Sequence, residues 1–269
     1  MNLVKVEMMN ATERIAEALQ MRGLFVVVKD DFIMFTEGNT KADVEKTRAL
    51  LTTIGIPTLW QENKFQVLIN RTSISIMKQI MNATGREFPV HMEGYHFHWR
   101  SFAQRRFGIK VNALDLDANM AMLVKTLNLV GITSLAGCNG HHHYTPNVQF
   151  SGVFQGAWFE VIQKTYLSGL TLQHNWQVHY GNRTGSCLRA NESSGRWDMN
   201  LIYQDTVQMA EVLQKHAGEI RELKNRVFKR NNEMKKAATH FTKEKDYSSL
   251  VNWMKKQVKG TLQKGRSEV

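Results

Sequence analysis

Hydrophobic and polar positions in the first 90 residues alternate between a helical pattern and a strand-like pattern. A helical stripe follows Thr12, which can cap the helix, and Gly23 can end it. The β-rich runs "LFVVVK" and "FIMFT" come next, and Asp30 and Asp31 between them suit a tight hairpin turn. This stretch therefore predicts a helix followed by a β-hairpin.

The same order then returns. Thr40 can cap a second helix, with Asp43 three residues later in a near match to a capping box. Gly55 can end that helix, and the runs "IPTLWQ" and "KFQVLI" predict a second hairpin. A third helix is predicted at about residues 73–83. The unit has the order αββαββα.

A similar but longer order follows the boundary segment "GREFPV". Asp117 can cap a helix, after which "GITSLAGC" and "NVQFSGVF" predict a hairpin. "GAWFEVIQKTYL" predicts a helix. "LTLQHNWQVHY" and "RWDMNLIY" predict two further strands, with an excursion rich in Gly, Ser and Asn between them. A second αββαββ-like lobe is expected here.

From about Asp205 the pattern becomes purely helical. Leu213, Ile220 and Val227 are seven residues apart, but His216 lies in the second seam, so a coiled coil and a packed surface helix both remain open. A final helix is predicted near 248–262. We expect these C-terminal helices to be a candidate homo-oligomer contact.

Together these patterns predict an α+β protein with two sheet-containing lobes, each with αββαββ-like order, and a helical basic C-terminal extension. The expected boundaries are 1–88 for the small lobe, 89–203 for the larger lobe and 204–269 for the extension.

The αββαββα order resembles the layout of the LAGLIDADG homing endonucleases, whose saddle of strands grips DNA. "SLAGCNG" repeats the opening letters of their motif. That motif needs a helix ending in an acid that holds a metal, whereas Asn139 stands at this place and the segment is predicted as a strand. We therefore infer no membership of that family, and a shared layout does not establish a function.

Composition and charge narrow the function classes. The chain has 269 residues, 42% of them hydrophobic, and two cysteines, which is typical of a folded protein without a disulfide framework. No apolar run is long enough to span a bilayer and no signal-peptide pattern opens the chain, so we expect a cytoplasmic protein without a membrane partner. The net charge is +11, and residues 200–269 contribute +7 of it, which favours an acidic partner.

The segment "YHFHWRSFAQRRFGIK" mixes aromatic and basic side chains, as a nucleic-acid surface requires. A half-buried strand followed by solvated arginines gives the same pattern. A lysine-rich tail can add nonspecific phosphate contacts, or be only a solvated helix face. The candidate contacts are Trp99, Arg100, Arg105, Arg106, Lys110, Lys255, Lys256 and Lys259.

The segment "GCNGHHHYTPNVQF" suggests a metal site, because thiolate and imidazole are ligands that zinc prefers. The candidate ligands are His96, His98, Cys138, His141 and His143. Glu93 or Glu160 could serve as a base if a metal-bound water were present. The alternative is a polar hairpin loop with one buried cysteine, and the decision depends on whether His96 and His98 lie beside that loop.

Other mechanisms lack their motifs: the chain contains neither a G-x-x-x-x-G-K-[ST] loop nor a G-x-S-x-G elbow. We therefore expect binding rather than catalysis, with nucleic acid as the leading ligand and an acidic protein surface as the other partner class. The alternatives are a metal-dependent hydrolase or zinc-stabilised protein, and a protein-interaction module such as an inhibitor or adaptor.

Overall fold

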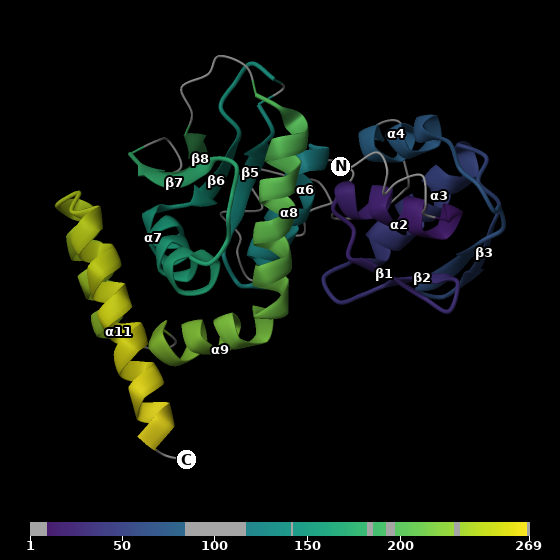
Figure 1. Cartoon of the computed structure of the whole chain (residues 1–269). Coiled ribbons are helices and arrows are strands. Elements are labelled where there is room, and N and C mark those ends of the chain that lie inside the picture. The colour runs from purple at the N-terminus through teal and green to yellow at the C-terminus, as the bar shows by residue number, and fades with distance from the viewer. Residues whose placement is uncertain are drawn as a thin grey trace.

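The computed structural model describes residues 10–83, 117–140, 142–181, 185–191, 197–228 and 232–267. Figure 1 shows two lobes side by side, each with its own sheet, and further helices below and to the left of the second lobe. The predicted α+β class with two sheet lobes is confirmed: each lobe contains a four-stranded antiparallel sheet.

The first lobe has the predicted order. Its elements are α2 (Ala11–Met21), β1 (Val26–Lys29), β2 (Phe32–Phe35), α3 (Lys41–Thr53), β3 (Thr58–Gln61), β4 (Lys64–Val67) and α4 (Ile74–Asn82). The strands are arranged β1-β2-β4-β3. One sheet face packs on the helices around Ile33 and Phe65, which have no exposed surface.

The local signals of this lobe are confirmed with one shift. Asp30 and Asp31 both have positive φ, 50° and 64°, as a tight hairpin turn between β1 and β2 requires. Thr40 and Asp43 form a full capping box at α3. The α2 cap is Asn10 rather than Thr12, because Asn10 and Glu13 bond each other's backbone N–H groups in a capping box.

The second lobe repeats this architecture. Its elements are α6 (Ala118–Leu129), β5 (Ser134–Cys138), β6 (Asn147–Ser151), α7 (Val153–Ile162) with a π-helical continuation η2 (Gln163–Leu167), β7 (Asn175–Tyr180), β8 (Gly185–Asn191) and α8 (Met199–Lys215). The strand order β5-β6-β8-β7 matches that of the first sheet, position for position. The duplication predicted from the sequence therefore extends to sheet topology.

Two predicted details of the second lobe are wrong. Along the chain, the fourth strand of this sheet is β8, and it lies in the stretch that was predicted to be a polar loop. The segment "RWDMNLIY", which was predicted to be a strand, instead leads into α8. Strand β8 was missed because only its inner positions are apolar or small, while Arg189 and Asn191 alternate with them. Asp117 makes no side-chain cap, because its carboxylate accepts the N–H of Asn139 at 3.0 Å.

The C-terminal helices α9 (Ala217–Phe228), α10 (Asn232–Lys243) and α11 (Tyr247–Ser267) follow α8. Leu213, Ile220 and Val227 are buried in the same core as the second sheet, and His216 caps the end of α8, so the heptad pattern reflects packed helices rather than a coiled coil. Leu250 and Met254 of α11 are fully buried in that core as well. The apolar stripe expected to join subunits is therefore covered within the chain.

The lobes meet where α2 contacts α6. Gly23 has φ +92° and lies so close to Ala121 that a Cβ atom there would collide with it. Beside this contact, Lys125 of α6 lies 3.1 Å from Asp43 of α3, and both side chains are buried. Lys125 also lies over the ring of Phe25, 4.9 Å from its centroid. A buried ion pair thus joins the two lobes.

Candidate nucleic-acid interface

The second sheet has one covered and one open face. Trp176, Leu188 and Phe150 point to the covered face and are buried in the core against α7. The intervening side chains point the other way and are exposed or half-buried, except for Cys187, which is buried. They belong to β6 (Asn147, Gln149, Ser151), β7 (Asn175, Gln177, His179) and β8 (Cys187, Arg189, Asn191). We call this set the outer face of the second sheet.

The strand register aligns these side chains in rows. Asn147 of β6 pairs with Arg189 of β8, and Arg189 pairs with Gln177 of β7. Cys138 of β5 extends the same row, since it pairs with Asn147. Neighbouring strands are about 4.8 Å apart, so the row from β6 to β7 spans roughly 10 Å. That span is comparable with the width of a B-DNA major groove, about 12 Å, whereas the whole four-stranded sheet is wider.

Hydrogen bonds position the polar tips of this face. Asn191 donates from Nδ2 to Gln177 Oε1 at 2.8 Å. The Nε2 atom of His179 lies 3.1 Å from Asn191 Oδ1. Arg189 lies beside Cys187, whose thiol pKa is raised by burial and lowered in part by that guanidinium. Arg189 itself stays exposed.

The charged side chains of the four strands have one sign, and one carboxylate, that of Asp117 before α6, lies beside Cys138 at the edge of the row. The four strands contain no Asp or Glu, and their single cationic side chain is Arg189. Asp and Asn are both rare in β-strands, so strand propensity alone does not explain why this face lacks Asp. Three Asn residues lie on the same face: Asn147, Asn175 and Asn191. Local propensity is most often violated at functional sites. Arg, Asn and Gln are also the side chains that pair bidentately with guanine and adenine edges.

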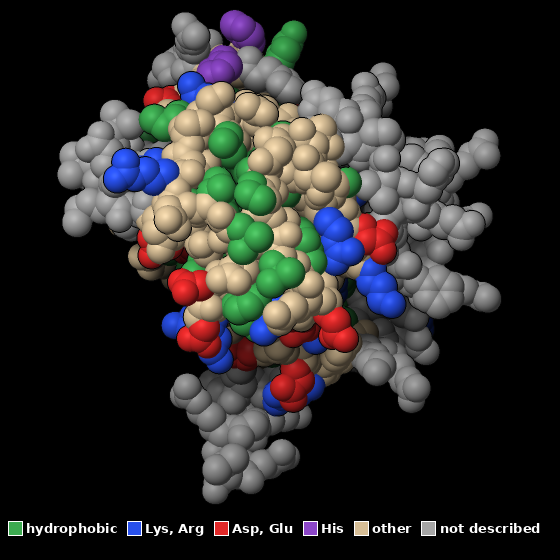
Figure 2. Space-filling view, turned by 90° about the vertical axis from the view of Figure 1, so that its right-hand side faces the viewer, with side chains coloured by type: hydrophobic (Ala, Val, Ile, Leu, Met, Phe, Trp, Pro, Cys, Tyr) green, Lys and Arg blue, Asp and Glu red, His purple; other side chains and the backbone are tan. Residues whose placement is uncertain are grey.

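The outer face of the first sheet is similar in charge and more apolar. Its strands also contain no Asp or Glu, and Lys29 and Lys64 are their cations. Lys64 lies over the ring of Phe32, 4.5 Å from its centroid. Val27 and Leu59 are 46% and 52% exposed. Figure 2 shows the first lobe from the side that lies at the right in Figure 1, with apolar side chains gathered over the middle and charged ones around them.

The predicted aromatic–basic contacts Trp99, Arg100, Arg105, Arg106 and Lys110 lie outside the described residues and remain a prediction. The predicted lysines Lys255, Lys256 and Lys259 belong to α11. Helix α11 packs on α7, and α7 packs on the covered face of the second sheet. The α11 lysines therefore lie on the opposite side of this lobe from the outer face and do not form one surface with it.

The structure describes only two of the five predicted metal ligands, Cys138 and His143. His96, His98 and His141 lie outside the described residues. Cys138 is half-buried; burial and nearby Asp117 raise its thiol pKa, and the N–H of Gly140 lowers it in part. Among the described residues, no group of three His, Cys, Asp or Glu side chains is arranged to hold a metal ion. The zinc hypothesis thus acquires no ligand set in this part of the chain.

The hairpin loop between β5 and β6 has a structural anchor instead. His142, at φ 67°, is bonded to Trp197 twice: its carbonyl accepts the Trp197 N–H at 3.1 Å, and its Nδ1 lies 3.1 Å from the Trp197 carbonyl oxygen. His143 is exposed. One of the three consecutive histidines therefore ties the loop to the start of α8.

The C-terminal ends of α2 and α6 can be compared with the motif of the LAGLIDADG homing endonucleases, in which a helix ends in an acidic residue. The segment "SLAGC" is strand β5, as predicted. The helices that open the two halves, α2 and α6, are followed by Arg22 and Val130 as their C-caps. Neither helix ends in an acid, so the metal-holding carboxylate of that motif is missing at both places.

Comparison of the chain with known family models, curated proteins and solved structures finds no match. Within the described residues, no helix is both long and apolar enough to cross a membrane.

Sequence reasoning missed the outer face of the second sheet because it missed β8. The signal was present: "GSCLRAN" alternates small or apolar residues with Arg189 and Asn191. Glycine and serine at the start of that run, typical of a loop, outweighed the alternation. Only the pairing of β8 with both β6 and β7 places Arg189 in the middle of an amide-rich row.

Proposed function

We propose that this protein is a non-catalytic nucleic-acid-binding protein that engages duplex DNA with the outer face of its second sheet. The observation that carries the proposal is the row Asn147–Arg189–Gln177, exposed or half-buried, with no carboxylate in the four strands. Sheets are known to read DNA grooves in other proteins, and Arg, Asn and Gln supply the donors and acceptors for base edges.

Duplex DNA suits this surface better than duplex RNA. The row is roughly 10 Å wide and is presented by a sheet, which needs a wide and accessible groove. The A-form RNA major groove is deep and narrow, and side chains do not read it. The overall charge of +11 supplies the nonspecific attraction to phosphates that precedes base readout.

A salt titration of DNA binding tests the proposal. Fluorescence anisotropy with a pool of random 25-base-pair duplexes at low salt should show binding that weakens as salt rises. For the duplex that binds best within that pool, Arg189→Ala should lower affinity by about tenfold, since a bidentate base contact contributes about 1–3 kcal/mol. The matched control is Arg226→Ala, which removes the same charge from a 53% exposed side chain on α9.

The variant pair separates base or phosphate contact from net charge. If Arg189→Ala and Arg226→Ala reduce affinity equally, the outer face makes no direct contact. If the unmodified protein fails to bind duplex DNA at low salt, the proposed function is wrong. The double variant Asn147→Ala/Gln177→Ala should lessen the preference among sequences more than it lessens binding to the random pool.

A further inference from the structure

Three polar side chains of the outer face form a hydrogen-bond chain with a defined direction. Asn191 Nδ2 donates to Gln177 Oε1 at 2.8 Å, which leaves the amide oxygen of Asn191 for another partner. That oxygen lies 3.1 Å from Nε2 of His179. Because an amide oxygen can only accept a hydrogen bond, Nε2 of His179 carries the hydrogen. The chain of donors therefore runs from His179 through Asn191 to Gln177.

The direction of this chain decides which groups Gln177 offers to a ligand. Its Oε1 atom already accepts a bond from Asn191, whereas no hydrogen bond of the described residues uses the two N–H groups on its Nε2. Gln177 is exposed. Its register partner Arg189 is exposed as well, and a guanidinium has five N–H donors and no acceptor. The centre of the row therefore presents mainly donors.

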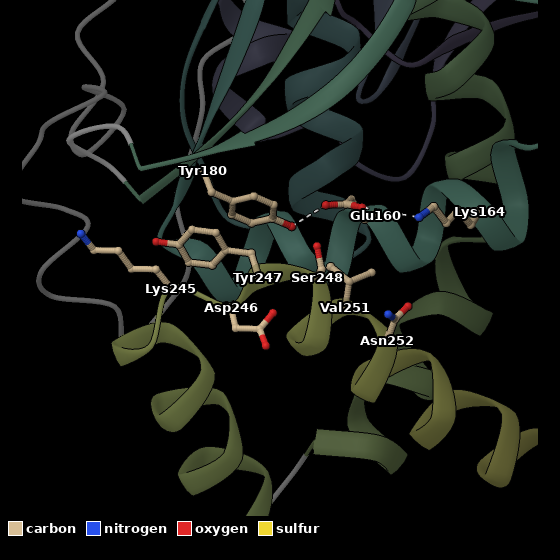
Figure 3. A pocket seen from close by; sticks show the side chains of 9 residues that line it. All are labelled: Glu160, Lys164, Tyr180, Lys245, Asp246, Tyr247, Ser248, Val251 and Asn252. Atoms are coloured by element: carbon tan, nitrogen blue, oxygen red, sulfur yellow. Dashed lines mark hydrogen bonds and ion pairs between the residues drawn. The ribbon is translucent and has the colours of Figure 1, made fainter.

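Strand β7, which carries two members of the hydrogen-bond chain, is anchored near both ends on its covered face. At one end, Trp176 Nε1 donates to Asp205 Oδ2 at 3.0 Å. At the other end, the Tyr180 hydroxyl donates to Glu160 Oε1 at 2.6 Å. Figure 3 shows the Tyr180 ring beside that of Tyr247, and the two centroids are 4.5 Å apart. These anchors keep the donors of the outer face in one geometry, as selective recognition requires.

A surface of donors is complementary to a base edge that presents acceptors. In the major groove, guanine presents two neighbouring acceptors, N7 and O6, whereas adenine presents one acceptor and one donor. Cytosine presents a donor, and thymine presents one acceptor beside a methyl group. The Asp117 carboxylate, which could accept from adenine or cytosine, bonds the Asn139 N–H and lies beside Cys138 of β5, three strands from β7. Guanine therefore matches the centre of the row best.

We propose that the outer face of the second sheet selects duplex DNA with guanine at the base pairs that Arg189 and Gln177 contact. Arg189 bonds O6 and N7 of one guanine, and Gln177 donates from Nε2 to an acceptor nearby. Asn191 is a positioning residue, because its bond keeps the oxygen of the Gln177 amide turned away from the base. This inference rests on the proposed DNA-binding function and adds the base that the surface prefers.

Replacement of single ring atoms in the DNA tests the base preference without changing the protein. The probe is the 25-base-pair duplex that binds best within the random pool, measured by fluorescence anisotropy at low salt. Placing 7-deazaguanine at every guanine removes the N7 acceptor but keeps base pairing, and it should lower affinity by about tenfold. Placing 7-deazaadenine at every adenine is the matched control and should lower affinity by less than about twofold.

The outcomes separate the base preference from DNA binding itself. If 7-deazaadenine lowers affinity as much as 7-deazaguanine does, the guanine inference is wrong while the DNA-binding proposal stands. If no duplex of the pool binds, both are wrong. Arg189→Ala should lose most of the difference between guanine and 7-deazaguanine, because its guanidinium supplies the N7 contact. An Arg189→Ala variant that keeps the full difference would overturn the assigned contact.

Asn191→Ala tests the positioning role. Without Asn191, Oε1 of Gln177 is released, and the amide can turn to pair with N6 and N7 of adenine. We expect this variant to acquire a sensitivity to 7-deazaadenine of about threefold or more. The control is Asn175→Ala, which removes the exposed amide opposite Asn191 and should acquire no such sensitivity, whatever its effect on overall affinity. If Asn191→Ala only weakens binding to all probes alike, the hydrogen-bond chain does not determine the base preference.

Discussion

A single buried carboxylate, Asp205 of α8, organises the chain before β7. Its Oδ1 accepts the Gln173 N–H at 2.6 Å, and its Oδ2 accepts the His174 N–H at 3.0 Å and the Trp176 Nε1–H at 3.0 Å. The His174 Nδ1 atom lies 2.7 Å from the same oxygen. Asp205 has no exposed surface. It therefore bonds two backbone and two side-chain groups, and the groups of His174 and Trp176 are buried with it.

Replacing this carboxylate should be costly. Asp205→Ala leaves its buried donors unpaired, and we expect it to lower the free energy of unfolding by at least about 3 kcal/mol. The matched control is Asp198→Ala at the start of the same helix, where an exposed cap bonds the Asn200 N–H at 2.8 Å. Loss of that cap should cost about 1 kcal/mol. Urea unfolding measures both, and equal losses would contradict the role given to Asp205.

Local chemistry at the residue scale was predictable where it depended on neighbours in sequence. The turn at Asp30 and Asp31 and the cap at Thr40 follow from backbone preferences over three or four residues. Asp117 was misassigned because its partner, the N–H of Asn139, is 22 residues away. The Asp117 carboxylate can bond either the start of the helix or a group far along the chain. The sequence indicates only the helix cap, because that contact is between neighbouring residues.

At the scale of elements, the sequence predicted the basic amphipathic helix α11 but not the surface against which it packs. Leu250, Val251, Met254 and Val258 are spaced to form an apolar stripe on one face of the helix, and all four are buried. The stripe alone fits a subunit contact as well as an internal one. Packing against α7 and α9 decided in favour of the internal one.

A charge in that stripe should detach the helix. Met254→Asp places an unpaired carboxylate in the core and should release the exposed turn at residues 244–246 from its packed helices, so that limited trypsin digestion at Lys243 and Lys245 becomes faster. Lys256→Asp, on the exposed side of the same helix, should leave the digestion pattern unchanged. If Met254→Asp resists digestion as the unmodified protein does, α11 is not held by its apolar stripe.

For the whole molecule, the junction between lobes rests on Lys125 and Asp43. Burial lowers the pKa of Lys125, and Asp43 opposes that shift by attracting the ammonium group. Asn39 Oδ1 accepts a further bond from Lys125 at 3.1 Å. The same Asp43 oxygen accepts the Thr40 N–H at 2.9 Å, so the inter-lobe pair also supports the start of α3.

Breaking this pair from one side should uncouple the lobes. Lys125→Met leaves Asp43 charged and buried, and we expect a loss of about 3 kcal/mol in the free energy of unfolding of the first lobe. Urea unfolding should then separate into two transitions. Lys125→Met/Asp43→Asn removes both charges and should recover most of the loss. A single transition at the original midpoint in Lys125→Met would show that the pair does not couple the lobes.

The sequence by itself determined the repeated order of helices and strands, the α+β class and the basic C-terminal region, because periodicity, turns and caps are properties of neighbouring residues. The tertiary structure decided what each surface faces. It placed β8 between β6 and β7, so that Arg189 joined Asn147 and Gln177 on an open face. It also packed α11 along α7. Both arrangements join residues far apart in the chain, and only packing fixes such pairs.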